Sequence, residues 1–141
     1  MAKKYKKKKP YYESERKWNH KNYWENNYKP SHKALLMIRR MKSLSKRRGF
    51  EWSDDWWFVD QITEIIENGY CVMSGIKFTA GFVGQKNGIR DPFKATPDRI
   101  DNLKGYEPSN VRWVVYIYNI MKNNFKDEDV QTFVNALKNF A

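Results

Sequence analysis

The stretch TPDRIDNLKGYEPSNVRWVVYIYNIMK, residues 96–122, decides the fold predicted for this chain. Its first part, Thr96 to Ile100, favours an extended segment, and Asn102 to Ser109, which contains a glycine and a proline, predicts a loop. Val111 to Val115 is a short apolar run typical of a strand, and a helix is expected from about Tyr116 to Asn124. Residues 96–124 therefore predict a ββα element, in which two strands precede one helix.

Further helices are predicted on both sides of this element. Residues 31–48 carry apolar side chains at helical spacing, with Ser31 as the expected N-cap and Gly49 as the stop. A helix capped by Ser53 is expected over residues 54–68, and a last one over 127–139. Tyr70 to Met73 predicts a short strand. The expected fold class is α+β, with helices around a small ββα core, residues 1–30 as an arm and residues 31–141 as one domain.

The charge is unevenly distributed along the chain. The net charge is +11, with 17 Lys and Arg against 3 Glu in residues 1–48 and 10 Lys and Arg against 13 acids in residues 49–141. A basic front half joined to a slightly acidic back half indicates an arm that binds a polyanion, and nucleic acid is favoured over a merely solubilising tail. No apolar run approaches the roughly 20 residues that span a membrane, so no membrane partner is expected.

The arm mixes aromatic and basic side chains without a clean period. Its rings can stack on bases while its cations contact phosphates, or they can pack onto the domain, and the sequence leaves both readings open. Cys71 is the single cysteine, which excludes an intrachain disulfide and favours a reducing, intracellular setting. One cysteine cannot hold a structural zinc alone, so no structural zinc is expected.

Two polar residues stand at positions that the ββα order can bring together. Asp98 lies near the end of the first predicted strand and Asn119 lies on the following helix. A carboxylate and an amide oxygen are hard donors suited to Mg²⁺ or Mn²⁺. The sequence therefore predicts a metal site formed by Asp98 and Asn119.

An ordered set of short motifs carries a resemblance to a known family. The chain contains Arg47-Arg48-Gly49-Phe50-Glu51, Cys71-Val72-Met73-Ser74-Gly75, Asp98-Arg99-Ile100-Asp101, Gly105-Tyr106, Asn110-Val111-Arg112-Trp113-Val114 and Asn119-Ile120-Met121-Lys122. In this order they resemble the phage HNH homing endonucleases, which belong to the His-Me finger (ββα-metal) nucleases, over about residues 40 to 138. The resemblance implies a metal-dependent endonuclease that hydrolyses phosphodiester bonds in DNA.

The resemblance also implies roles for individual residues. Asp98 and Asn119 match the metal ligands, and Asn110 matches the asparagine that braces the loop. The general-base histidine of the family falls on Arg99, which cannot accept a proton but can contact the scissile phosphate or the charged transition state. Asp101 is the first alternative as base, with His20 or His32 as the second.

Basic residues around this element are the expected DNA contacts. They are Lys33, Arg39, Arg40, Lys42, Lys46, Arg47, Arg48, Lys104, Arg112 and Lys122. The expected partner is double-stranded DNA, and one ββα element contains one active centre, so double-strand cutting needs a homodimer or two successive nicks. Because Arg99 replaces the base, a nucleic-acid-binding protein without cleavage is the second hypothesis, and a structural protein bound to a large RNA is the third.

Overall fold

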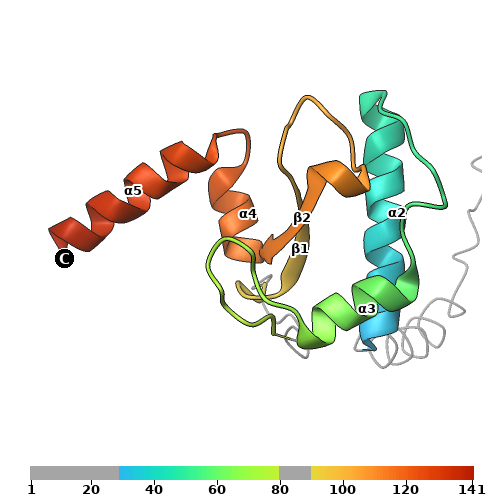
Figure 1. Ribbon diagram of the computed structural model, residues 1–141, viewed down its shortest axis with the longest axis horizontal. Helices are drawn as coiled ribbons and strands as arrows, with labels where there is room; N and C mark the ends of the chain where they lie inside the picture. Colours follow the sequence, from blue (N-terminus) through green and yellow to red (C-terminus); the bar gives the residue numbers. More distant parts are fainter. Residues whose placement is uncertain (1–28, 80–89) are drawn as a thin grey trace, which may run out of the picture.

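The computed structural model describes residues 29–79 and 90–141, and the predictions for the arm therefore lie outside the described residues apart from its last two positions. The chain is a mixed α+β protein. Four α-helices surround one antiparallel sheet of two strands in the described ranges. Figure 1 shows the hairpin between helix α2 on one side and helix α4 on the other. None of the helices described has both the length and the apolar character that crossing a bilayer requires.

Helix α2 spans Pro30–Arg48, close to the prediction. Proline occupies the first turn, where its missing N–H costs nothing, so Ser31 lies inside the helix and is not the N-cap that was expected. Ala34, Met41 and Ser45 form the buried stripe. Gly49, at φ 73°, ends the helix as predicted, because the amide groups of Gly49 and Phe50 donate back to the carbonyls of Lys46 and Ser45.

Helix α3 spans Val59–Asn68 and packs against α2, so the predicted start at residue 54 was wrong. The segment before it forms a turn, in which the N–H of Asp55 donates to the hydroxyl of Ser53. Asp54 accepts hydrogen bonds from Lys42 and from the indole of Trp52 instead of lying in a helical first turn. Tertiary partners therefore take the polar groups that the sequence assigned to a helix N-terminus.

The predicted strand from Tyr70 to Met73 is also absent as a strand. The chain makes a tight turn there, with a single bridge between Tyr70 and Lys77 and with Gly75 at φ 71°. Cys71 is buried within this turn and is free.

The sheet pairs β1, Ala95–Arg99, with β2, Val111–Val115. A short 3-10 turn, Pro108–Asn110, leads into β2. Helix α4, Tyr116–Lys122, follows at once and contacts both strands, which confirms the order strand, strand, helix. Val114 and Val115 are buried in the same apolar core as Ala34, Met41, Ile62 and Ile66.

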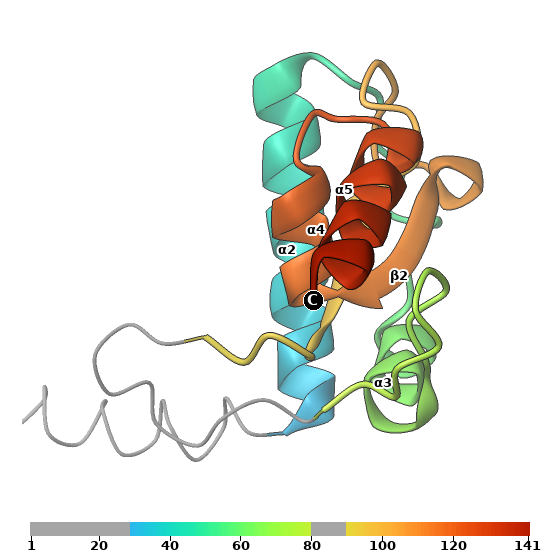
Figure 2. The same ribbon diagram turned by 90° about the vertical axis from the view of Figure 1, so that its left-hand side faces the viewer.

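Helix α5, Asp127–Phe140, projects away from the rest of the molecule in Figure 1, and Figure 2 shows the same helix pointing out of the body toward the viewer. The apolar face of α5 is covered only in its first part. Val130 is buried, whereas Phe133 and Leu137 are each 53% exposed.

Candidate functional site

Helix α4 lies along one face of β1 in a regular set of three contacts. The ammonium of Lys94 lies 4.7 Å from the centre of the Tyr116 ring, Asn119 donates to the hydroxyl of Thr96, and Lys122 donates to the carboxylate of Asp98. Alternate residues of a strand share a face, and residues three apart share a helix face, so positions 94, 96 and 98 can meet 116, 119 and 122. Asp98 and Asn119 thus lie at the same interface between β1 and α4 but at successive levels, since Asp98 meets Lys122 and Asn119 meets Thr96.

Asp98 is buried and binds two cations. Its side chain is 4% exposed, its Oδ2 accepts a hydrogen bond from Nε of Arg112 at 2.8 Å, and its Oδ1 accepts one from Nζ of Lys122 at 3.2 Å. Arg112 is the direct cross-strand partner of Asp98 in the sheet. A buried ion pair offsets the cost of desolvation only when its geometry and hydrogen bonds are good, as they are here.

Arg112 also reaches the last helix. Its two terminal nitrogens donate to both oxygens of Asp127 at 2.6 and 2.8 Å, and the hydroxyl of Tyr118 donates to Asp127 as well. The hydrogen bonds from Arg112 hold the pKa of Asp127 below its usual value, although partial burial opposes them. Burial and then the neighbouring Asp127 raise the pKa of Tyr118, so its phenol stays protonated. Two carboxylates and two cations form one electroneutral cluster.

Asn119 contacts the residues directly before Asp98. Its amide nitrogen lies 3.3 Å from the hydroxyl oxygen of Thr96 and 3.3 Å from the carbonyl oxygen of Pro97. Asn119 precedes Lys122 by one helical turn, and Lys122 binds Asp98. The two predicted metal ligands, Asp98 and Asn119, therefore belong to the same small region.

The donor atoms around Lys122 have the chemistry of a hard-cation site. Its ammonium lies against a carboxylate oxygen of Asp98 and, at 2.9 Å, the carbonyl oxygen of Arg99, and the side chain is 2% exposed. Carboxylate and carbonyl oxygens are ligands that Mg²⁺ accepts, and one of each lies against the ammonium. Within the described ranges no three His, Cys, Asp or Glu side chains cluster to hold a metal. A divalent ion here therefore requires that Lys122 give up its position.

Asn110 joins the two sides of the loop between the strands. Its Oδ1 accepts a hydrogen bond from the N–H of Asp101, and its Nδ2 donates to the carbonyls of Asp101 and Gly105, each at 2.9 Å. The side chain is 4% exposed. These bonds fix the backbone that follows Asp98, which is the bracing geometry expected of this residue.

Arg99 faces away from Asp98, because neighbouring residues on a strand point to opposite sides. Its guanidinium donates to the carbonyls of Asn102 and Lys104 and lies 5.5 Å from the rings of both Phe50 and Tyr106. In this arrangement Arg99 stabilises the loop.

The candidate bases differ in where they lie. Asp101 is partly exposed, and its Oδ1 accepts the N–H of Leu103, which forms a turn two residues long. His32 lines a pocket with Leu35 and Val59 at the junction of α2 and α3, whereas the partners of Asp98 come from β2 and α4. His20 lies outside the described residues. Asp101 is thus the candidate nearest in the chain to Asp98.

Two of the predicted DNA contacts have little exposed surface. Arg112 and Lys122 have side chains that are 13% and 2% exposed and are committed to Asp98, so their cations do not face solvent. Lys33 is partly buried, and its pKa is lowered by burial. The other predicted contacts are exposed, although Lys42 pairs with Asp54; they are Arg39, Arg40, Lys42, Lys46, Arg47, Arg48 and Lys104.

The sequence reasoning missed Tyr118 and Asp127 as members of the cluster. Asp127 lies in the first turn of α5, where an acid favours the helix dipole, and this local role does not indicate its bonds to Arg112 and Tyr118. A signal for Lys122 was present, since it lies three residues after Asn119 and so shares its helix face. Comparison with protein-family models, with curated proteins and with solved structures gives no match for this chain.

Proposed function

We propose that this protein is a metal-dependent endonuclease that hydrolyses phosphodiester bonds in double-stranded DNA. The observation that carries the proposal is the cation held at the end of β1, where oxygens of Asp98 and Arg99 surround the ammonium of Lys122. Asn119 lies one helical turn away. The oxygens of Asp98 and Arg99 would hold a divalent ion, which would supply positive charge to the scissile phosphate and the departing oxygen.

The surrounding residues have separate tasks in this proposal. Asn110 keeps the loop after β1 in one conformation through its three hydrogen bonds. Asp101 is held in that loop and is the proposed base that accepts a proton from the attacking water. The exposed cations of α2 supply affinity for the phosphate backbone, which makes binding strongly dependent on salt.

A second candidate function is DNA binding without cleavage. It is favoured by the two protein cations on Asp98, which together with Asp127 leave the cluster neutral without a metal. Arg99 also donates hydrogen bonds to two carbonyls of the loop. In this alternative Lys122 permanently replaces the metal ion.

Cleavage of supercoiled plasmid with Mg²⁺, Mn²⁺ or EDTA separates the two candidates. The nuclease is expected to nick only with a divalent ion, and Asp98→Asn and Asn119→Ala are expected to abolish nicking. Asp60→Asn is the matched control, because Asp60 is an exposed acid on α3.

Lys122→Met gives the sharpest contrast. If a metal competes with the ammonium, the variant is expected to reach half-maximal cleavage at a lower Mg²⁺ concentration than the wild type. Tight DNA binding with no cleavage in either protein under any metal contradicts the nuclease and supports the second candidate.

A further inference from the structure

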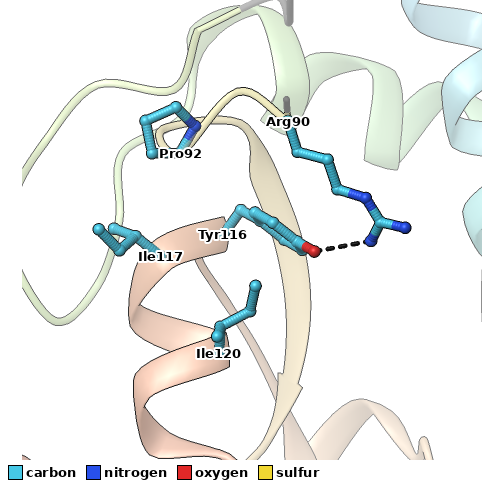
Figure 3. Close-up of a pocket in the computed structure, with 5 residues that line it drawn as sticks. All are labelled: Arg90, Pro92, Tyr116, Ile117 and Ile120. Atoms are coloured by element: carbon cyan, nitrogen blue, oxygen red, sulfur yellow. Dashed lines mark hydrogen bonds between the residues drawn. The ribbon is translucent and has the colours of Figure 1, made fainter. Parts of the chain in front are cut away.

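A second group of charged residues lies at the opposite end of β1 from Asp98. Arg90 and Lys94 precede the strand, and Tyr116 begins α4. The guanidinium of Arg90 donates to the hydroxyl of Tyr116 at 2.6 Å and lies over the same ring whose centre is 4.7 Å from Lys94 (Figure 3). One tyrosine thus holds two cations in place.

Helix α2 adds further positive charge to this group. Burial lowers the pKa of Lys94, and so do the neighbouring charges of Arg90, Lys33 and Arg40. The carboxylate that opposes this effect is Asp91, which is buried and already accepts hydrogen bonds from Thr79 and from the N–H of Phe93. Arg90 and Lys94 lie against the same ring, so their charges repel each other, and an anion that binds between them relieves the repulsion.

An open pocket adjoins these cations. It has a volume of about 360 Å³ and is lined by Arg90, Pro92, Tyr116, Ile117 and Ile120. Figure 3 shows the guanidinium of Arg90 at the hydroxyl of Tyr116, with Ile117 and Ile120 on α4. Ile117 is 46% exposed and Ile120 is 57% exposed, so apolar surface lies beside concentrated positive charge. A nucleotide has the same pairing of an anionic phosphate with a less polar sugar and base.

The length of the basic surface favours a polymer over a single small anion. Arg39, Lys46 and Arg47 are exposed on the same helix as Arg40. A helix of 19 residues is roughly 28 Å long, which matches about eight base pairs of duplex.

We propose that Arg90 and Lys94 form a phosphate site that binds the backbone of duplex DNA. The apolar wall of the adjoining pocket contacts the sugar of the same nucleotide. Lys94 and Asp98 are four residues apart on one strand face, or roughly 14 Å. If Asp98 is the cleavage centre, a relation that rests on the proposed function, the phosphate site contacts the duplex about four nucleotides away from it.

The test is DNA binding by full-length protein in EDTA, measured by fluorescence anisotropy on a short labelled duplex over a series of NaCl concentrations. R90Q/K94Q is expected to weaken binding about 10-fold and to reduce the slope of log K against log salt by about 2, because two phosphate contacts are lost. K138Q, which removes one exposed cation from α5, is expected to leave the affinity near that of the wild type.

A second variant guards against misfolding. Y116F keeps the ring under Lys94 but removes the hydroxyl that orients Arg90, so a smaller loss of affinity is expected. Wild-type affinity and slope in both variants overturn the phosphate site. The same assay is repeated with RNA of the same sequence. If the variants lose affinity for the RNA alone, the assignment to DNA is overturned. EDTA excludes metal-dependent cleavage, so the binding assay tests the phosphate site separately from the nuclease. If the protein never cuts DNA but shows the expected change in slope, the proposed nuclease activity is contradicted and the phosphate site is supported.

Discussion

The ammonium of Lys122 lies 3.2 Å from Oδ1 of Asp98, and both side chains are almost completely buried, at 2% and 4% exposed. This pair fastens α4 to the end of β1. It also occupies the position that the proposed metal needs, so the same contact bears on stability and on activity.

Lys122→Met is expected to lower the free energy of unfolding by about 3 kcal/mol, because Asp98 then stays buried and keeps only its ion pair with Arg112. Urea denaturation measures the loss. The double variant Asp98→Asn/Lys122→Met is expected to cost less than the sum of the two single variants. Strict additivity would show that the two side chains do not stabilise each other.

Asp127 predicts a pH dependence of stability. Hydrogen bonds from Arg112 lower its pKa in the folded protein relative to the unfolded chain, where an aspartate titrates near about 3.9. The stabilisation is therefore fully present above about pH 4 and is lost as the pH falls through the folded pKa. In urea denaturation between about pH 2 and pH 6, wild type is expected to lose more stability toward low pH than Asp127→Asn. Parallel curves for the two proteins would contradict the assignment.

Asn110→Ala is expected to destabilise the protein by about 3 kcal/mol, since it leaves the N–H of Asp101 and two carbonyls without their partner in a buried place. Asn110→Asp is expected to be at least as damaging, because a carboxylate cannot donate to those carbonyls. Thermal unfolding measures both. Asn124→Ala, at an exposed position, is the control.

Gly105→Ala is expected to cost about 1–3 kcal/mol through overpacking. A methyl group at this position would lie 2.8 Å from Cβ of Phe50, and the loop or the segment after α2 would have to shift. Gly75→Asn is the comparison, since a Cβ added at Gly75 would meet nothing within 4 Å and asparagine tolerates its positive φ. A Gly105 variant as stable as the Gly75 variant would show that the loop yields easily.

Much of the fold was predictable because local patterns agree with the final packing. The apolar run from Val111 to Val115 is the strand that forms, and Gly49 ends α2 through its left-handed backbone. The turn before α3 was not predictable. Asp54 accepts hydrogen bonds from Trp52 and from the more distant Lys42, and the sequence pattern does not indicate these contacts.

The candidate site was predictable in its location and less so in its partners. The ββα order brings Asp98 and Asn119 to the same interface between β1 and α4, and the position of Asn110 indicates the brace. Arg112 and Lys122 were interpreted as DNA contacts because cations in a basic protein are usually exposed. Their burial follows from the acids that face them across the sheet and from α5, which only the folded chain brings together.

Arg112 has a mechanical consequence for the protein. One guanidinium holds both the carboxylate of the candidate site and the first residue of α5. Beyond Val130 the apolar side chains of α5 are largely exposed, and the helix projects from the body (Figure 1). Through these bonds, a displacement of α5 at Asp127 would shift Arg112, which also binds Asp98. The position of α5 is thus coupled through Arg112 to the candidate site.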